Sequence, residues 1–209
     1  MTDKNEPPKI AILAWGSLIW DDQWPQFDKQ RGEWRKDGPV LPLEFSRVST
    51  SRDKALTLVI DPVNGNDCKV MYAMSKRKNP ADAIADLRDR EGTIMDHMGF
   101  YFANDPDRKG VPQIPDTIPA WAKEMGFDVV VWAGMPSNFA EKTVFRKDEP
   151  FSVDAAVAHL QNITPKGKAA AATYVWRAPD LVITPLRTRL QAEPWFPAPK
   201  AEEPTIQKV

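Results

Sequence analysis

One acidic residue, Glu91, is set apart by the helix on which it is predicted to lie. The sequence predicts this helix between Asn79, which suits an N-cap, and Gly92, which suits a C-terminal stop. At about 100° per residue, Glu91 falls on the same face as Ile84 and Leu87, whereas the aspartates of the segment fall on the opposite face. A carboxylate that faces inward at the partially negative end of a helix breaks a local rule, and such breaks are typical of functional sites. The alternatives are a surface glutamate in the last turn or one half of a buried ion pair.

A second candidate is the turn Gly16-Ser17-Leu18, which directly follows a short apolar segment. Its consecutive backbone N–H groups are suited to binding a carboxylate or an oxyanion, because glycine lets a ligand approach the main chain closely. An ordinary turn after a strand is the alternative. The second glycine of a nucleophile elbow is absent, so the segment is not that motif.

Arg47 is the third candidate, because it alternates in phase with the apolar residues Leu43 and Phe45. A guanidinium that points where these side chains point is able to bind a substrate carboxylate through two parallel hydrogen bonds. Two alternatives remain open: an ion pair inside the protein, for instance with Glu91, or a strand end that already emerges into solvent.

Other common chemistries find little support in the sequence. His159 lies in a segment of ordinary amphipathic pattern and is interpreted as structural, and His97 as a loop contact or a proton-transfer group. Cys68 is the only cysteine, which excludes an internal disulfide, and it has no activating neighbour in the sequence. The absence of an HExxH pattern, of a Walker loop and of GxGxxG argues against a dedicated metal site and against the usual nucleotide-binding motifs.

The composition is that of an ordinary globular protein. The chain has 209 residues, of which 42% are hydrophobic and 27% charged, and its net charge of −1 argues against nucleic acid or an anionic membrane as its main partner. No apolar signal segment begins the sequence, and we expect a cytoplasmic protein. We predict one domain over residues 1–193 and a flexible, proline-rich tail over 194–209; the oligomeric state is left open.

The predicted elements favour the α+β class. The apolar segment Lys9–Trp15 predicts a strand covered on both faces, and Leu56–Asp61 and Lys69–Ser75 predict strands joined by the turn Pro62–Asn66. So many strands in succession favour a small mixed, curled β-sheet or barrel with helices packed outside. Further strands are predicted at Leu41–Ser49, Phe100–Phe102 and Asp128–Ala133, and helices at Ala120–Met125, from Ser152 to Gln161 and at Lys168–Arg177, with Leu181–Leu190 ambiguous.

Two of these segments resemble a known family. The stretch Ala14–Trp20, AWGSLIW, is similar to the Tyr-Gly-Ser-Leu loop of the γ-glutamylcyclotransferase-like superfamily, especially its ChaC-type branch. Leu87–Gly92, LRDREG, resembles the segment that carries that family's catalytic glutamate. Phe45–Thr50 followed by Leu56–Val59 resembles the strand pair between them. The resemblance covers about the first hundred residues in order, and the second half of the chain does not align.

The resemblance implies a reaction that needs no cofactor. In this family the α-amine of a γ-glutamyl group attacks its own γ-carbonyl, which closes 5-oxoproline and expels an amine, an amino acid or a peptide; glutathione is one such substrate. The implied general base and acid is Glu91, because one partly desolvated carboxyl can take the proton from the amine and return it to the leaving nitrogen. The implied substrate-binding residues are Trp15, Gly16, Ser17, Leu18 and Arg47.

One position departs from the family pattern. The first residue of the loop is typically tyrosine, and here it is Trp15, whose indole donates a hydrogen bond but neither accepts one nor ionises as a phenol does. A second hypothesis is therefore a catalytically silent domain of the same fold that binds a small molecule or a partner.

Overall fold

Strand β1 (Ile10–Ala14) occupies the centre of the fold and is buried along its whole length. The computed structural model describes residues 6–108, 110–111 and 114–198. Successive residues of β1 belong alternately to two separate apolar cores, because the pleat sends neighbouring side chains to opposite faces of the sheet. The strand predicted over Lys9–Trp15 is confirmed, with both of its faces covered.

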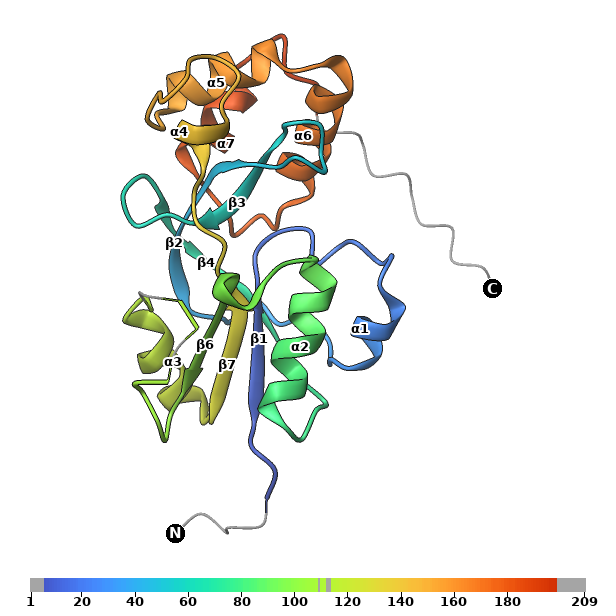
Figure 1. The fold of residues 1–209 in the computed structure, drawn as a ribbon, viewed down its shortest axis with the longest axis vertical. Helices are drawn as coiled ribbons and strands as arrows, with labels where there is room; N and C mark the ends of the chain where they lie inside the picture. The colour runs from blue at the N-terminus through green and yellow to red at the C-terminus, as the bar shows by residue number, and fades with distance from the viewer. Residues whose placement is uncertain (1–5, 109, 112–113, 199–209) are drawn as a thin grey trace.

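A four-stranded sheet forms around β1 in the order β5-β1-β7-β6 (Figure 1). Its other strands are β5 (Met71–Met74), β6 (Met98–Phe102) and β7 (Val129–Ala133). β1 runs parallel to β7 and antiparallel to β5. Helix α2 (Pro80–Glu91) packs against β6 and β7 and so covers one face of this sheet.

The second sheet has three strands in the order β3-β2-β4, with β2 (Val40–Val48) between β3 (Leu56–Ile60) and β4 (Asn66–Lys69). The predicted hairpin between Leu56–Asp61 and Lys69–Ser75 is wrong. β3 and β4 each pair with β2, and the second segment divides at Val70, after which β5 crosses to the first sheet. The backbone N–H and C=O groups on both edges of the long strand β2 need hydrogen-bond partners. β3 and β4 provide them by pairing with one edge each, whereas a hairpin of β3 with β4 would pair these two strands with each other instead.

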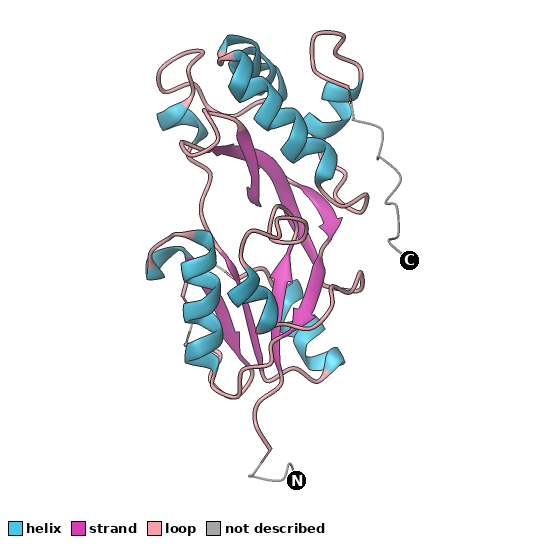
Figure 2. Cartoon of the chain, turned by 90° about the vertical axis from the view of Figure 1, so that its right-hand side faces the viewer, coloured by secondary structure: helices cyan, strands magenta, loops and turns pink. Residues whose placement is uncertain are grey.

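The fold is a mixed α+β arrangement with two sheets, which confirms the predicted class. The sheets are not closed into a barrel, so that part of the prediction is wrong. Within the described residues the first sheet ends at β5 and β6 and the second at β3 and β4, and no strand ladder joins these edges. Figure 2 shows the strands running between helices at the two ends of the elongated molecule.

Helix α2 begins and ends where the sequence places it. The Asn79 side chain accepts a hydrogen bond from the N–H of Ala81 at 3.0 Å, and Pro80 occupies the first position, where no N–H is needed. Gly92 adopts the left-handed conformation at φ 58° and closes the last turn onto Arg88 and Asp89. These caps fix which residue is the last of the helix, and that residue is Glu91.

Helices gather in a layer above the second sheet (Figure 1). The two predicted helices of this region are confirmed and the ambiguous segment Leu181–Leu190 contains a short third one, each with a serine or threonine N-cap. None of the helices within the described ranges is long and apolar enough to cross a membrane. The layer comprises α4 (Phe139–Lys142), α5 (Val153–Asn162), α6 (Pro165–Arg177) and α7 (Pro185–Gln191), and the remaining helices are α1 (Pro25–Lys29), the short 3-10 helix η1 (Met95–His97) and α3 (Thr117–Met125).

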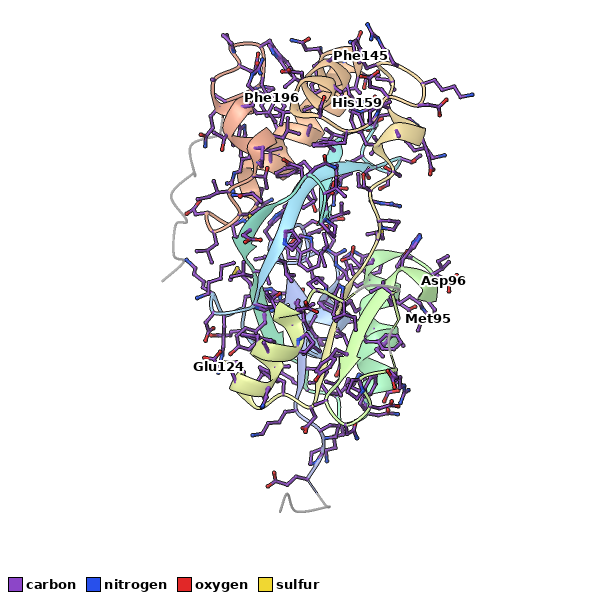
Figure 3. The ribbon with its side chains drawn as sticks, turned by 90° about the vertical axis from the view of Figure 1, so that its left-hand side faces the viewer. Met95, Asp96, Glu124, Phe145, His159 and Phe196 are labelled. Atoms are coloured by element: carbon purple, nitrogen blue, oxygen red, sulfur yellow. The ribbon has the colours of Figure 1, made fainter. Side chains whose placement is uncertain are left out.

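His159 lies inside this helical layer, as Figure 3 shows, and its role is structural. Its Nε2 donates to the carbonyl of Lys54 at 2.8 Å, which leaves Nδ1 to accept from the N–H of Val144 at 3.0 Å. Burial lowers the pKa of this imidazole, in keeping with a neutral ring. His159 therefore ties the loop before β3 to the segment after α4.

Packing continues past residue 193. Phe196 is buried, and the indole of Trp176 donates to the carbonyl of Pro197 at 2.7 Å. Positions 199–209 of the predicted tail lie outside the described residues.

The linker between β7 and α4 is fastened to the end of β2. Asn138 accepts from the N–H of Val48 at 2.7 Å and donates to the same residue's carbonyl at 3.2 Å. One amide side chain thus satisfies both backbone groups, as a neighbouring strand would. Ser137 adds a bond to the carbonyl of Ser46 at 2.7 Å.

Replacing Asn138 by alanine should lower the free energy of unfolding by about 1–3 kcal/mol, because both backbone groups of Val48 lose their partner. Asn162→Ala is the matched control, since its amide is exposed and bonds only to the carbonyl of Ala158 within its own helix. We expect a change within about 0.5 kcal/mol for the control. Chemical denaturation measures both, and equal losses would contradict this account of the linker.

Candidate active site

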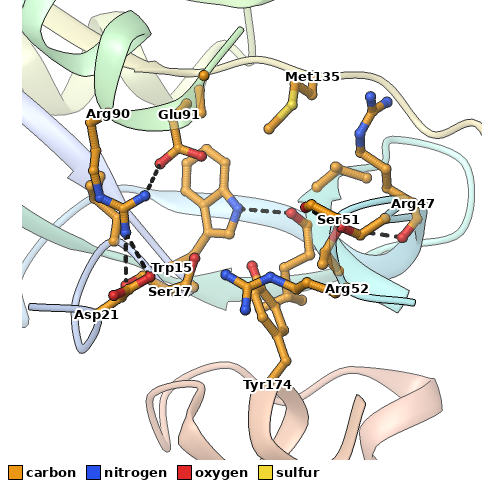
Figure 4. A pocket seen from close by; sticks show the side chains of 18 of the residues that line it. Trp15, Ser17, Asp21, Arg47, Ser51, Arg52, Arg90, Glu91, Met135 and Tyr174 are labelled. Atoms are coloured by element: carbon orange, nitrogen blue, oxygen red, sulfur yellow. Dashed lines mark hydrogen bonds and ion pairs between the residues drawn. The ribbon is translucent and has the colours of Figure 1, made fainter. Parts of the chain in front are cut away.

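A cavity of about 800 Å³ opens where β1, the end of α2, the loop between β2 and β3 and helix α6 meet (Figure 4). All the residues that the sequence singled out for the site line it, although they come from three separate segments of the chain. They are Trp15, Gly16, Ser17, Leu18, Arg47 and Glu91.

Glu91 projects from the last turn of α2 and keeps only 15% of its side-chain surface exposed. Its Oε1 lies 3.8 Å from Nη1 of Arg90, whose side chain is 6% exposed. The guanidinium of Arg90 also lies 3.5 Å from a carboxylate oxygen of Asp21 and donates to the carbonyl of Ser17 at 3.5 Å. The buried guanidinium of Arg90 therefore lies between two carboxylates, and it links α2 to the turn after β1.

The environment raises the pKa of Glu91. Burial is the largest cause, since it disfavours the charged form, and the negative charge of Asp21 acts in the same direction. The positive charges of Arg90 and Arg52 oppose the rise without cancelling it. A carboxyl whose pKa moves toward neutrality is suited to accept a proton and then return it.

Arg52 is a site residue that the sequence analysis missed. It lies in the loop between β2 and β3 and lines the cavity, with its guanidinium 5.2 Å from the ring centre of Tyr174 and 5.9 Å from that of Trp20. The next two residues, Asp53 and Lys54, both have positive φ values, 51° and 69°, which are unfavourable for residues with a side chain. The bond from His159 to the carbonyl of Lys54 helps to hold this strained backbone.

Arg47 also lines the cavity, although the strand that carries it is less regular than the spacing of its residues suggests. A β-bulge interrupts the pairing of β2 with β3 between Glu44 and Arg47, which breaks the simple alternation. Its Nη1 donates to the carbonyl of Pro136 at 2.7 Å, and burial lowers the pKa of the guanidinium. Among the described residues Arg47 forms no ion pair with Glu91, so that alternative is wrong.

The turn after β1 is held by its carbonyl groups. The carbonyls of Gly16 and Ser17 accept from the N–H groups of Ile19 and Asp21, at 3.0 and 2.8 Å. Tyr174 of α6 packs against this turn so closely that a Cβ added at Gly16 would collide with its hydroxyl. Glycine is required here for that close approach.

The indole of Trp15 lines the cavity, and its N–H is already engaged by the main chain. Its Nε1 donates to the carbonyl of Leu58 in β3 at 3.4 Å. The residue is 6% exposed and belongs to the core that extends into the helical layer. Trp15 therefore provides a wall of the cavity and no polar group to a ligand.

The residues that sequence reasoning missed differ in how well the sequence marks them. Arg90 follows Leu87 by three positions and Ala83 by seven, so helical spacing alone places it on the buried side. Nothing local marks Arg52, because a distant histidine helps to hold the loop that carries it. Tyr174 lies on a helix that the sequence predicted, but no local pattern indicates that its ring reaches the turn after β1. Within the parts of the chain described, no group of three or more His, Cys, Asp or Glu side chains is placed to hold a metal ion.

Comparison of the chain with protein-family models, with curated proteins and with solved structures found no match. The likeness to the γ-glutamylcyclotransferase-like superfamily therefore rests on the short segments quoted above, and any function must be argued from the residues of the cavity.

A glutamate held at a raised pKa costs stability, and this can be measured without a substrate. Because the folded-state pKa of Glu91 lies above its unfolded value, the native state loses stability as the pH rises through that interval. We expect Glu91→Gln to unfold at a higher denaturant concentration than the unaltered protein at pH 7. The difference should shrink below the ordinary pKa of a glutamate, where the wild-type side chain is neutral in both states.

Glu193 provides the control, because its side chain is 14% exposed and its pKa is lowered by the hydrogen bond from Arg189. The sign is reversed, so Glu193→Gln should lose stability at pH 7. A Glu91→Gln protein that is less stable than wild type at neutral pH would contradict the electrostatic description of the cavity.

Proposed function

We propose that this protein is a cyclotransferase that releases 5-oxoproline from a γ-glutamyl amine, amino acid or peptide, with Glu91 as general base and general acid. The observation that carries the proposal is the position of the Glu91 carboxyl. It is largely desolvated, its pKa is raised, and it faces a cavity of about 800 Å³ beside the glycine turn of β1. The similarity of two short segments to the γ-glutamylcyclotransferase-like superfamily supports the same reaction.

The chemistry balances with this one carboxyl. The ionised Glu91 takes a proton from the substrate's α-ammonium group, and the freed amine nitrogen forms a bond to the γ-carbonyl carbon. As the tetrahedral intermediate collapses, the bond to the leaving nitrogen breaks and that nitrogen receives the proton from Glu91. The regenerated carboxylate then takes the surplus proton from the new ring nitrogen and passes it to the released amine, so the products are 5-oxoproline and an ammonium ion. No water is consumed and no electrons are transferred, so the reaction requires no cofactor.

The charges around the cavity suit a substrate that carries a carboxylate. Arg47 and Arg52 line the cavity, and within the described ranges neither forms an ion pair with an acidic side chain, whereas Arg90 is engaged by Asp21 and Glu91. We assign the α-carboxylate of the substrate to Arg52, because its guanidinium is already held over two aromatic rings and lies close enough to Glu91 to influence its pKa. Holding the α-carboxylate also places the neighbouring α-amine for attack.

A silent binding domain is the second candidate, and the observation that favours it is Trp15. Its indole replaces the phenol of the related loop and directs its only donor to the backbone of Leu58. A domain of this kind would bind γ-glutamyl compounds and leave them intact.

Replacing Glu91 by glutamine should reduce 5-oxoproline formation on the order of a hundredfold or more, because the amide can neither accept nor return the proton. The assay incubates the protein with γ-glutamyl amines, γ-glutamyl amino acids and glutathione and detects 5-oxoproline by mass spectrometry. Glu124→Gln, on the exposed side of α3, is the control and should retain full activity. A folded Glu91→Gln protein that works at the wild-type rate would refute the assignment. Binding without product formation by the wild type would instead support the silent domain.

The pH dependence of kcat/KM should shift in opposite directions when two neighbouring charges are removed. Glu91 must be ionised to act as a base, so activity rises as the pH rises through its pKa. Asp21→Asn removes a charge that raises this pKa, and the rise in activity should move to lower pH. Arg52→Gln removes a charge that lowers it, and the rise should move to higher pH. Asp22→Asn, an exposed neighbour of Asp21, should leave the profile unchanged; shifts of the same sign in both variants would show that another group titrates.

A further inference from the structure

Tyr174 lines the cavity and places a phenol beside the turn that follows β1. It lies on α6, in the half of the chain to which the family resemblance does not extend, and is 6% exposed. Its hydroxyl rests against Gly16, where an added Cβ would collide with the oxygen and would lie 3.0 Å from Cζ. Figure 4 shows the ring rising from α6 toward the part of the cavity occupied by Trp15 and Arg52. The hydroxyl is thus placed at the turn expected to bind the substrate's oxygen atoms.

The phenol of Tyr174 is a neutral hydrogen-bond donor at physiological pH. Burial, and then the negative charge of Glu91, raise its pKa to about 12. The charge of Arg52 and hydrogen bonding to the backbone of Ser17 and Leu58 oppose this rise without reversing it. The influence of Glu91 on the phenol also shows that the two groups share one electrostatic environment.

The ring of Tyr174 is held in place on several sides. Trp20 and Phe45 contact it edge to face, with ring centres at 5.9 and 6.1 Å, and the guanidinium of Arg52 lies 5.2 Å from its centre. A donor fixed before the reaction begins is effective at stabilising charge that develops during it, because it does not need to reorient.

We propose that Tyr174 is a catalytic residue, which donates its O–H to the γ-carbonyl oxygen of the substrate as that oxygen becomes an oxyanion. The inference rests on the proposed cyclotransferase function and adds a residue to it. The phenol missing at position 15 is then supplied by a helix of the opposite layer. The proton stays on Tyr174 throughout: the hydrogen bond strengthens when the nitrogen–carbon bond forms and weakens when the leaving nitrogen departs, while Glu91 alone carries both transferred protons.

The kinetic test is Tyr174→Phe, which removes only the hydroxyl. Loss of one oxyanion donor typically lowers kcat by about a hundredfold to a thousandfold, and we expect such a loss with little change in KM. Tyr101→Phe is the control, because Tyr101 lies on β6 outside the cavity lining, and it should leave kcat unchanged. A Tyr174→Phe enzyme with the wild-type kcat would overturn the inference.

A second test needs no substrate. Gly16→Ala should lower the melting temperature of the wild-type protein, because the new methyl group collides with the hydroxyl of Tyr174. In the Tyr174→Phe background the same substitution should lower it less, since the oxygen is gone. Equal losses in the two backgrounds would show that the hydroxyl does not lie against Gly16, and the inference would fail.

The two tests separate this inference from the proposed function. If the wild type forms no 5-oxoproline from any compound of the panel, the proposed function fails and the catalytic role of Tyr174 falls with it. If the wild type forms 5-oxoproline and Tyr174→Phe does so equally fast, only the inference about Tyr174 is wrong.

Discussion

The site depends on the burial of two carboxylates around a single guanidinium. Arg90 is nearly fully buried and must satisfy Asp21, Glu91 and the carbonyl of Ser17 together. Burial raises the pKa of Glu91 most, the charge of Asp21 adds to the rise, and the positive charges of Arg90 and Arg52 oppose it without cancelling it. The same guanidinium joins the end of α2 to the turn after β1. The electrostatic balance and the shape of the cavity therefore have a common origin.

The walls of the cavity come from parts of the fold that have separate cores. The end of α2 belongs to the core under the first sheet, whereas Tyr174 belongs to the core that extends into the helical layer. The bulged strand β2 brings Arg47 to the boundary, and the strained loop after it brings Arg52. Rigid elements on both sides hold the polar groups, while the space between them stays open to a ligand. An exposed loop alone would fix neither the carboxyl nor the phenol.

Sequence reasoning succeeded where the physics is local. The bounds of α2 follow from the Asn79 side chain and the left-handed Gly92, and the burial of β1 follows from its unbroken apolar run. It failed where contacts between segments far apart in the sequence determine the structure. The pairing of β3 and β4 depends on the two free edges of β2, and the closed barrel was wrong because no ladder joins the described edges of the two sheets. Arg52 escaped notice because His159, far along the chain, helps to hold its loop, and Tyr174 because its contact with Gly16 joins segments about 160 residues apart.

The caps of α2 impose a fixed length on that helix. Glu91 is its final residue, and the chain reverses immediately at Gly92. Adding or removing a single amino acid between the caps would rotate the carboxyl by about 100° around the axis and would carry it out of the cavity. Substitutions along the solvated side of α2 leave this angle untouched. During evolution the residues on the solvated side of α2 are therefore free to change, whereas the number of residues between the two caps is not.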